Sequence, residues 1–483
     1  MADGQHRCVR HLAHVALIAA CVGVLPSAEC QLAQVLGDHM VLQRGQPIRI
    51  WGTAEPGAAV SVSFADQRGT ATADATGTWS ATLPAMEASG PHALEARSGA
   101  SVATRSDVMI GDVWLASGQS NMVFALASTS EWPQVRTQGR FPSIRICKLP
   151  GSHALAPSEA YARDIQWQQL DSARDGYFSA VAYHFAVTIQ PRAGVAIGVI
   201  QAASGGTMAE QWTPEAALRA DDPLSRTFAA RDQALARLAA DPAARIGSAE
   251  AGAAALYNGT VHPLRQLRFA GVLWYQGEAN SRSRDDYRPR LTTLIRSWRA
   301  LFGQPALPFV LVQLPDFGLP TDDGWMRVQE AQRLVALDLG LPLVVTMGQG
   351  SKVTIHPANK AMIGQRAALA ALQHVYRLPV AGSSPAAQAL RFDGASAVLE
   401  FDADLVATEP VSGFELAGPD QVFASATAQV SGRRVTVSAA GVPQPVAIRY
   451  LWTHAPAVIS LAGATGLPVG PFRFGVGAPQ TAP

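Results

Sequence analysis

A serine in the first third of the chain has the surroundings of a nucleophile. Ser120 stands in Gly-Gln-Ser-Asn-Met at residues 118–122, where an apolar run ends at a glycine. If that run is a strand and the serine opens a helix, the hydroxyl is exposed and the free N–H groups of the first helical turn face the same point. An ordinary helix N-cap serine has a similar local sequence. Taken alone, the motif favours the N-cap role.

Two further apolar runs are followed by groups that could stabilise an oxyanion. Gly206 lies in Ala-Ser-Gly-Gly-Thr at residues 203–207, and paired glycines let main-chain N–H groups approach a ligand closely. A simple tight turn is the alternative there. Gln276, Glu278 and Asn280 follow the second run. Their amides could donate to a developing negative charge, and the carboxylate could orient the amides or the substrate.

A fourth junction supplies a candidate general base. His356 precedes an amphipathic stretch, and an imidazole beside a serine hydroxyl can take its proton. A lone histidine is more often structural, so this assignment depends on the other three junctions. Because reacting groups gather beyond the carboxyl ends of parallel strands, we expect the four junctions to meet at one edge of a sheet.

The elements that would position these residues follow an alternating pattern. Apolar runs typical of strands buried on both faces occupy residues 194–201, 269–275, 309–314 and 343–346. Helical stretches, for example residues 287–302 and 359–374, lie between or after them. This alternation predicts an α/β core with a parallel sheet covered by helices on both faces.

The rest of the chain predicts two β regions around that core. Residues 31–105 contain β-forming runs at 47–52, 58–64 and 77–83 with turn residues between them, typical of a β-sandwich module. The core is expected over residues 106–375, with an Ala-rich helical insertion at about 214–256. Residues 376–483 return to strand patterns, at 397–401, 434–438 and 446–452.

The first thirty residues have the pattern of a secretory signal peptide. Arg7 and Arg10 precede an apolar run at residues 15–25, and Pro-Ser-Ala follows at 26–28. That run is short for a membrane span, so we expect a secreted or periplasmic protein without a membrane anchor after removal of residues 1–30. A buried N-terminal helix is the alternative.

Composition excludes several classes of function. Lys and Arg number 38 against 37 Asp and Glu, a net charge of +1, and no long basic run suggests nucleic acid or an acidic membrane as a partner. This balance is compatible with a neutral or sugar-like substrate. Cys8 and Cys21 fall within the expected signal and Cys30 lies at its last residue, so no disulfide framework is expected. HExxH, Walker and strand-GxGxxG-helix motifs do not occur, and we expect no metal or cofactor.

Together these segments resemble the sialate O-acetylesterase family, a branch of the SGNH hydrolases. The resemblance covers residues 41–474, and the order Trp-Tyr-Gln-Gly-Glu argues against a chance match. Inside the candidate site the matching segments are Gly-Gln-Ser-Asn-Met at 118–122, Gly-Gly-Thr at 205–207, Trp-Tyr-Gln-Gly-Glu at 274–278 with Asn280, and Ile-His-Pro at 355–357 with Asn359 and Lys360. Outside it they are Leu-Tyr-Asn-Gly at 256–259, His-Pro-Leu at 262–264, Gly-Leu-Pro at 466–468 and Pro-Phe-Arg at 471–473.

The resemblance implies a fold, a reaction and a substrate class. The fold would be an SGNH-hydrolase-like parallel sheet flanked by helices, with Ser120 as nucleophile and His356 as base. The Ser120 N–H, Gly206 and an amide of Gln276 or Asn280 would form the oxyanion hole. The substrate would be an O-acetylated sugar such as 9-O-acetylsialic acid, and an acetylated polysaccharide such as xylan is the competing choice.

One departure from the family pattern affects the mechanism. The family carries an aspartate two or three residues before the histidine, where this chain has Thr354 and Val353. Losing this acid costs serine hydrolases on the order of ten-thousandfold in turnover without abolishing catalysis. Three interpretations follow: a Ser–His dyad, an acid recruited from elsewhere such as Glu278, or an impaired enzyme. A carbohydrate-binding pseudoenzyme is the alternative from another functional class, and a purely structural β-rich secreted protein is the last.

Overall fold

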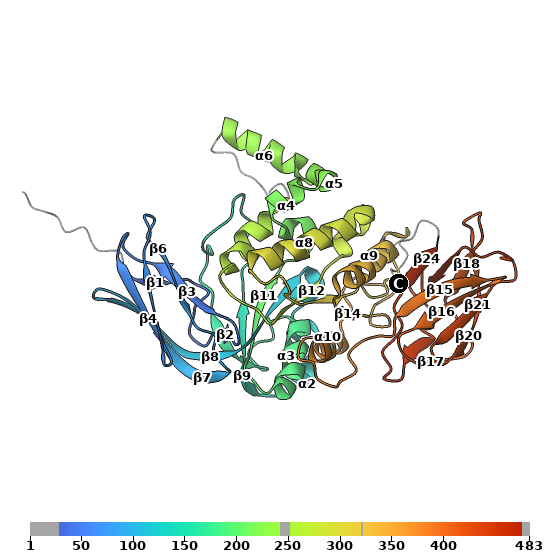
Figure 1. The fold of residues 1–483 in the computed structure, drawn as a ribbon, viewed down its shortest axis with the longest axis horizontal. Coiled ribbons are helices and arrows are strands. Elements are labelled where there is room, and N and C mark those ends of the chain that lie inside the picture. Colours follow the sequence, from blue (N-terminus) through green and yellow to red (C-terminus); the bar gives the residue numbers. More distant parts are fainter. Residues whose placement is uncertain (1–28, 242–251, 320–321, 476–483) are drawn as a thin grey trace, which may run out of the picture.

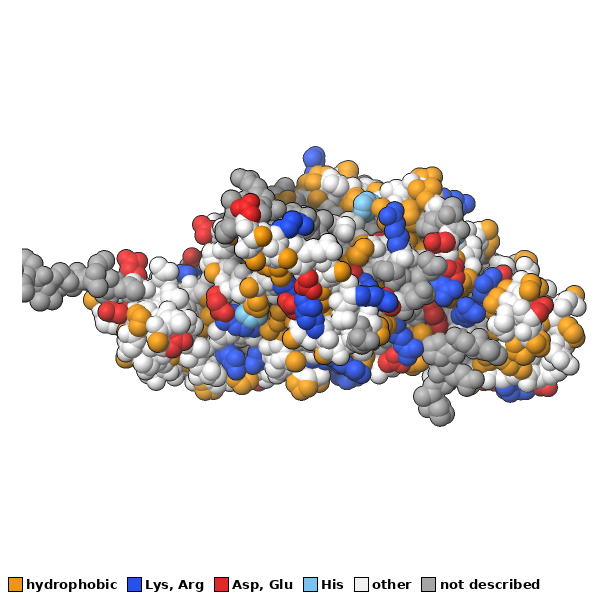
Figure 2. Space-filling model, turned by 90° about the horizontal axis from the view of Figure 1, so that it is seen from above, with side chains coloured by type: hydrophobic (Ala, Val, Ile, Leu, Met, Phe, Trp, Pro, Cys, Tyr) orange, Lys and Arg blue, Asp and Glu red, His pale blue; other side chains and the backbone are white. Residues whose placement is uncertain are grey.

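The molecule is elongated, with a β module at one end, an α/β centre and a second β region at the other end (Figure 1). A computed structural model describes residues 29–241, 252–319 and 322–475. The predicted signal peptide therefore lies almost entirely outside the described residues. Figure 2 shows basic and acidic side chains interspersed over one face without a broad area of one sign, in keeping with the net charge of +1.

The central part of the large sheet is parallel, as predicted. Its strands lie in the order β10-β9-β11-β8-β12-β13-β14, and only the edge strand β10 pairs antiparallel along this path. The bounds are β8 Ser101–Gly118, β9 Arg140–Lys148, β10 Trp167–Asp171, β11 Ile197–Ala203, β12 Gly271–Tyr275, β13 Phe309–Val312 and β14 Leu343–Val344. The four predicted apolar runs are β11, β12, β13 and β14, which confirms the α/β class of the core.

Helices cover both faces of this sheet. The helices α3 (Ala180–Ala193) and α10 (Ala361–His374) pack together on one face, and α8 (Tyr287–Leu301) and α9 (Gly324–Leu339) on the other (Figure 1). Two of them, α8 and α10, coincide with the stretches predicted from sequence. Because helices shield both faces, β12 and β13 are buried at every residue, which explains their uninterrupted apolar sequences.

The N-terminal module is built from two sets of strands and is continuous with the core. One sheet contains β1 (Gln31–Leu32), β3 (Ile48–Thr53) and β6 (Thr78–Leu83). The strands β2 (Val41–Gln43), β4 (Ala59–Phe64), β5 (Gln67–Thr72) and β7 (Ser89–Ser98) belong to the large sheet through β8. The predicted boundary between residues 105 and 106 falls inside β8, so one strand serves both parts.

The C-terminal region is a set of antiparallel strands, as predicted. The strands are β15 Ala387–Asp393, β16 Ser396–Phe401, β17 Leu405–Ala407, β18 Phe414–Ala417, β19 Phe423–Ser425, β20 Thr427–Ser431, β21 Arg434–Ser438, β22 Ala447–Tyr450, β23 Leu461–Gly463 and β24 Phe472–Gly475. Their buried side chains form a second core that also contains Val345 and Met347, directly after β14. The region is therefore packed against the α/β centre.

The Ala-rich segment after β11 is helical, as predicted. It contains α4 (Glu215–Arg219), α5 (Asp222–Ser225) and α6 (Ala229–Ala240), while residues 242–251 lie outside the described part. Leu218, Leu224 and Phe228 form a small separate core with Ala253 and Ala254. Within the described residues, no helix is both long and apolar enough to cross a bilayer.

Candidate active site

A cavity of about 730 Å³ lies at the carboxyl edge of the parallel strands. It is lined by segments that follow β8, β11, β12 and β13, together with the loop before α10. The lining residues are Gln119, Ser120, Gly206, Met208, Glu278, Ala279, Ser281, Arg282, Phe317, Leu319, Asp322, Trp325, Ile355 and His356. Four of the six predicted site residues thus meet in one cavity, as the positions of the junctions predicted.

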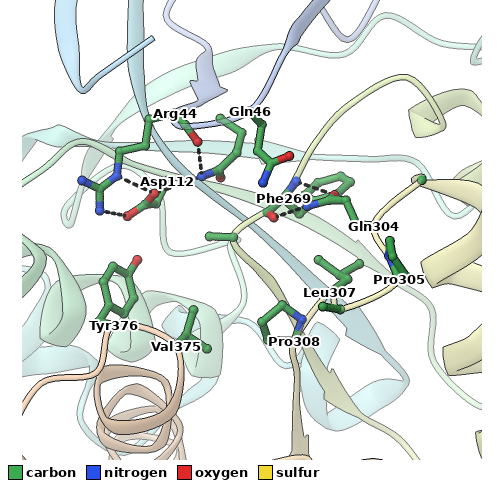
Figure 3. A pocket seen from close by; sticks show the side chains of 14 residues that line it. Arg44, Gln46, Asp112, Phe269, Gln304, Pro305, Leu307, Pro308, Val375 and Tyr376 are labelled. Atoms are coloured by element: carbon green, nitrogen blue, oxygen red, sulfur yellow. Dashed lines mark hydrogen bonds and ion pairs between the residues drawn. The ribbon is translucent and has the colours of Figure 1, made fainter. Parts of the chain in front are cut away.

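A second cavity, of about 400 Å³, lies at the opposite edge of the sheet. It is lined by segments that precede β12 and β13, and by Arg44, Asp112 and Tyr376 (Figure 3). The guanidinium of Arg44 donates two hydrogen bonds to the buried Asp112 carboxylate, at 2.9 and 3.0 Å. None of the predicted site residues lines this cavity.

Ser120 begins the short helix α1 (Ser120–Val123) directly after the central strand β8. The chain can turn there because Gly118 has φ +140° and lies against β12, where an added Cβ would be 2.0 Å from the Tyr275 carbonyl oxygen. No other residue fits this position. The first N–H groups of a helix have no acceptor within the helix, so the Ser120 N–H is available to the cavity. The sharp turn leaves the serine partly exposed at the cavity wall.

The Gly-Gly pair after β11 passes directly beside Ser120. A Cβ added to Gly205 would lie 3.7 Å from the Ser120 Cβ, whereas one added to Gly206 would meet nothing within 4 Å. Gly206 has φ +70°, a conformation that favours glycine. Gly206 therefore borders open space in the cavity that also contains Ser120. A substrate oxygen bound there could accept a hydrogen bond from a main-chain N–H of this turn.

His356 lines the same cavity from the loop before α10. Burial lowers the pKa of its imidazole, and the nearby ammonium of Lys360 lowers it further. Among the described residues its Nε2 has no hydrogen-bond partner, and no hydrogen bond joins it to Ser120. Catalytic hydrogen bonds commonly tighten only when substrate is bound. The lowered pKa favours the neutral imidazole, which is the form a general base requires.

The amides of Gln276 and Asn280 lie outside the cavity lining. Both side chains are fully buried. Gln276 Nε2 donates to the Thr207 carbonyl at 3.1 Å and to Asn280 Oδ1 at 2.7 Å. Asn280 Nδ2 donates to Glu210 Oε2 at 3.0 Å, and its Oδ1 accepts the Ala209 N–H at 3.0 Å. In this arrangement the two amides support the segment after Gly206, and the oxyanion role predicted for them stays a prediction.

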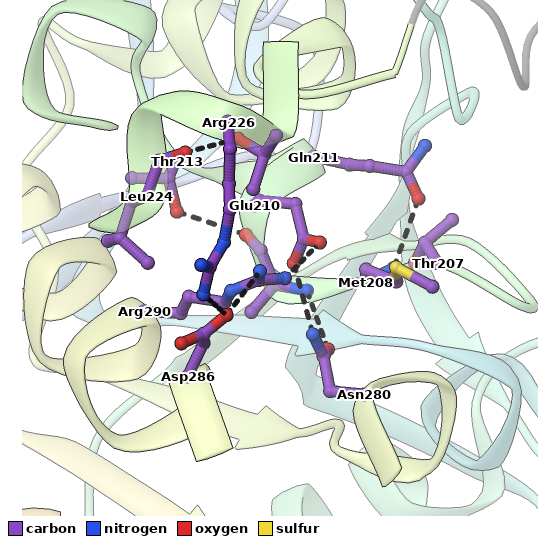
Figure 4. Close-up of polar contacts among 12 residues, drawn as sticks. Thr207, Met208, Glu210, Gln211, Thr213, Leu224, Arg226, Asn280, Asp286 and Arg290 are labelled. Atoms are coloured by element: carbon purple, nitrogen blue, oxygen red, sulfur yellow. Dashed lines mark hydrogen bonds and ion pairs between the residues drawn. The ribbon is translucent and has the colours of Figure 1, made fainter. Parts of the chain in front are cut away.

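A buried ion pair holds these amides in place. Glu210, Asn280 and Arg290 converge from three segments, and Arg290 Nη1 binds Glu210 Oε1 (Figure 4). Arg290 Nη2 also lies 3.3 Å from Asp286 Oδ2, which Arg226 of the helical insertion contacts at 2.6 Å. The loop that carries Gly206 is thus connected to the insertion through charged groups.

Glu278 faces the cavity but is not paired with the histidine. Its Oε1 accepts the Asn121 amide at 2.7 Å, whereas its Oε2 is buried without a hydrogen-bond partner among the described residues. Burial raises the pKa of Glu278, and the hydrogen bond from Asn121 opposes this shift. Lys360 contacts the other end of the Asn121 amide. Burial lowers the pKa of Lys360 to about 8, although the negative charges of Glu278 and Glu131 act in the opposite direction.

Thr354 and Val353 stand where the family carries its aspartate. Thr354 Oγ1 accepts the main-chain N–H of His356 at 3.1 Å, and Val353 is 77% exposed. Asp316, which follows β13, is bound to main chain. Asp316 Oδ1 accepts the N–H groups of Gly348 at 2.8 Å and Gly350 at 3.2 Å. Asp316 therefore supports the start of the histidine loop rather than the imidazole.

Several cavity residues were not identified from the sequence. Arg282 and Asp322 are exposed, charged side chains at the cavity, and Phe317, Leu319 and Trp325 add apolar surface. Arg282 precedes α8, the others precede α9 or, in the case of Trp325, lie in its first turn, and no motif marked them. Asn121 and Lys360 were part of the quoted motifs, but no role was assigned to either. Among the described residues, no group of three or more metal-ligating side chains is close enough to hold an ion.

The fold and the cavity define a class of protein before any comparison. It is an α/β protein in which a serine at the end of the central strand, a glycine N–H and a neutral histidine share one cavity, the arrangement needed for acyl transfer. Residues 110–373 match the family described as carbohydrate esterase, sialic acid-specific acetylesterase, and the chain belongs to this family.

Relatives support this membership. A carbohydrate acetylesterase from Xanthomonas citri of known structure is 36% identical, with a TM-score of 0.82, and the match covers 92% of this chain and 99% of that one. Sialate O-acetylesterase from Homo sapiens is 29% identical over 328 residues, covering 62% of this chain and 60% of that protein. The mouse protein of the same name is 27% identical over 350 residues, covering 63% and 64%. The chain thus spans about 60% of the human relative's length.

Proposed function

We propose that the protein is a secreted SGNH-type esterase that removes O-acetyl groups from sugars through an acetyl-serine intermediate. The observation that supports this most directly is the shared cavity of Ser120, Gly206 and His356 at the end of the central strand. The family membership and the name of the Xanthomonas citri neighbour agree with it.

The proposed reaction has two halves. Ser120 Oγ attacks the acetyl carbon while His356 takes the hydroxyl proton, and the carbonyl oxygen becomes an oxyanion near the N–H groups of Ser120 and Gly206. Collapse of this intermediate expels the sugar oxygen, which receives the proton from His356. Water then attacks the acetyl-serine with His356 again as base, releasing acetate and restoring the free serine.

The proposed substrate is an acetylated sialic acid or a related acetylated sugar. A cavity of about 730 Å³ can hold a monosaccharide, and Phe317, Leu319 and Trp325 provide apolar surface for a sugar face. Acetylated xylan is the competing substrate, because its acetyl esters require the same chemistry. Acetate release from 9-O-acetylsialic acid and from acetylated xylan, measured side by side, decides between the two.

The first prediction concerns the nucleophile. Ser120→Ala should abolish acetate release from every substrate and labelling by a fluorophosphonate probe, because both require the hydroxyl. The melting temperature should change little, since the serine makes no side-chain hydrogen bond among the described residues and is partly exposed. Hydrolysis that continues in Ser120→Ala would place the nucleophile elsewhere.

A second candidate function rests on the position before the histidine. His356 has no carboxylate partner there, so a sugar-binding protein with an inactive site is the alternative. In that case the wild-type protein would bind acetylated sugars in calorimetry without releasing acetate or reacting with the probe.

A further inference from the structure

The side chain of Asn121, next to the candidate nucleophile, lies where three segments of the chain meet. Its Nδ2 donates to Glu278 Oε1 at 2.7 Å and to the main-chain carbonyl of Ile355 at 3.0 Å. Its Oδ1 accepts the ammonium of Lys360 at 2.6 Å. The side chain is fully buried. Both N–H donors and the carbonyl oxygen are thus used, one donor toward Glu278 after β12 and the other two bonds toward the loop before α10.

Asn121 and one of its three partners are the chain neighbours of the two catalytic candidates. Asn121 follows Ser120 directly, and Ile355 precedes His356 directly. The bond between Asn121 and the Ile355 carbonyl therefore connects the serine turn to the histidine loop at the residues next to Ser120 and His356. The main chain of the histidine loop has little other regular structure, because residues 352–360 form no helix or strand.

The other two partners hold the amide rigidly. Lys360 is buried, and its Nζ also lies 4.9 Å from the centre of the Phe124 ring, which favours a cation. Glu278 is buried on the opposite side. A neutral amide is suited to this place because it can accept from the ammonium and donate to the carboxylate at the same time, whereas an aspartate could only accept.

We propose that Asn121 is a positioning residue that holds the histidine loop against the serine turn, so that the His356 ring stays in the cavity of Ser120 without a carboxylate beside it. The proposal rests on the proposed esterase function. It assigns to a buried amide the part of the missing acid's role that concerns orientation. The electrostatic part of that role remains unfilled.

Two variants of Asn121 test this proposal in the full-length protein. Asn121→Ala removes all three hydrogen bonds, and Asn121→Asp is isosteric, leaves no cavity and keeps only the bond to Lys360. Both should lower kcat about 100-fold with KM changed less than about threefold, because small misplacements of reacting groups cost on this order. Activity of Asn121→Asp near that of the wild type would overturn the proposal, because it lacks both donors.

Gln304→Ala is the matched control at the opposite edge of the sheet. Gln304 donates to the Phe269 carbonyl at 2.9 Å and accepts the Phe269 N–H at 3.0 Å, so the variant also loses side-chain bonds to main chain (Figure 3). Its kcat should remain that of the wild type even if its melting temperature falls. An equal loss of kcat in Gln304→Ala would show that activity follows overall stability, and would overturn the proposal.

The pH profile separates positioning from general destabilisation. His356 shares its surroundings with Lys360 and, in the cavity, with Glu278, Arg282 and Asp322. If the loop loosens in Asn121→Ala, water reaches the imidazole, burial lowers its pKa less, and the acid limb of kcat/KM moves to higher pH. A variant that is merely less stable would lose amplitude at every pH with an unchanged midpoint, which would count against the proposal.

Hydrogen exchange gives a readout that does not need activity. The amides of residues 351–358 should exchange faster in Asn121→Ala than in the wild type, and at the wild-type rate in Gln304→Ala. If the wild type releases no acetate but this difference is present, the proposed function fails and the positioning of the loop stands. Unchanged exchange in Asn121→Ala would overturn the positioning role whatever the activity.

Discussion

At the scale of single residues, the histidine is the part of the site that departs most from a complete triad. The ring of His356 has a cation, Lys360, as its charged neighbour, and both burial and that cation lower its pKa. Its neutral form therefore persists below the ordinary histidine pKa of about 6.5. This favours proton acceptance over a wide pH range but gives no stabilisation of the imidazolium that forms during the reaction.

Restoring an acid should increase turnover at one position and not at its neighbour. Thr354 is exposed, but its hydroxyl reaches back to the His356 main-chain N–H, so we expect Thr354→Asp to place a carboxylate beside the histidine. We expect kcat to rise at least about tenfold with little change in KM, since the acid acts in the transition state. The acid limb of kcat/KM should move to higher pH, because a nearby carboxylate raises the histidine pKa. Steady-state kinetics between pH 4 and 9 measures both.

The control for this prediction is Val353→Asp. Val353 is 77% exposed, so an aspartate there should point to solvent and leave kcat unchanged. If instead Glu278 already supplies the acid, Thr354→Asp would be neutral or harmful and Glu278→Gln would remove most of the activity. Under our interpretation Glu278→Gln retains most of the activity, because the glutamine oxygen can still accept the hydrogen bond from Asn121.

At the scale of elements, the site is held by contacts between helix ends. Glu131, at the start of α2 (Trp132–Val135), accepts the Lys360 N–H at the start of α10 at 2.9 Å. Its Oε1 also lies 3.4 Å from Nε2 of His184 in α3. Although burial raises the pKa of Glu131, these hydrogen bonds lower it to about 2. One carboxylate thus joins three helices beside the histidine loop.

The stabilising effect of Glu131 should depend on pH. Its folded-state pKa of about 2 lies below the unfolded value near 4.3, so its contribution is complete above about pH 4.5 and is lost as pH falls through 2. Glu131→Gln should lower the free energy of unfolding by about 2 kcal/mol at pH 7, and by clearly less at pH 3. Urea denaturation at both pH values measures the difference.

An exposed glutamate provides the comparison for Glu131. Glu400 forms a surface ion pair with Arg434 at 2.6 Å, with its side chain 41% exposed. Glu400→Gln should change the free energy of unfolding by less than about 1 kcal/mol at either pH. If Glu131→Gln lowered the free energy of unfolding by the same small amount as Glu400→Gln, at both pH values, the role assigned to Glu131 would be contradicted.

At the scale of the whole molecule, the three parts share their cores. The N-terminal module contributes Ile50, Phe64 and Trp79 to the same hydrophobic cluster as Trp114 of the central sheet. The C-terminal strands pack with Val345 and Met347 of the α/β part. Neither β region is therefore a detachable appendage, and strand β8 belongs to two parts at once.

This continuity limits where an N-terminal leader could be removed. We propose export with cleavage of the leader near residues 26–31. The residues that follow this region belong to the folded N-terminal module. Cys30 is buried, and β1 (Gln31–Leu32) pairs with β3. N-terminal sequencing of the exported protein should find a start that retains β1. A chain that stays in the cytoplasm with Met1 intact would refute the export proposal.

The sequence by itself determined the features that depend on local pattern. The buried strands, the helices α8 and α10 and the serine turn after β8 were all predictable, because apolar runs, helical periodicity and glycine at a tight turn act over a few residues. The meeting of Ser120, Gly206, Glu278 and His356 in one cavity also followed, since parallel strands place their carboxyl ends at a common edge.

Only the tertiary structure decided how the side chains at that edge are directed. The hydrogen bonds of Asn121 reach partners 157, 234 and 239 residues away, and no local pattern encodes such distances. The same holds for the inward turn of the Asn280 amide, which donates to Glu210 in its ion pair with Arg290. The Gln276 amide donates in turn to Asn280 and to the Thr207 carbonyl. A buried polar side chain turns toward the donors and acceptors that still need a hydrogen-bond partner once the segments have packed. Those groups come from distant parts of the sequence, so only the folded structure identifies them.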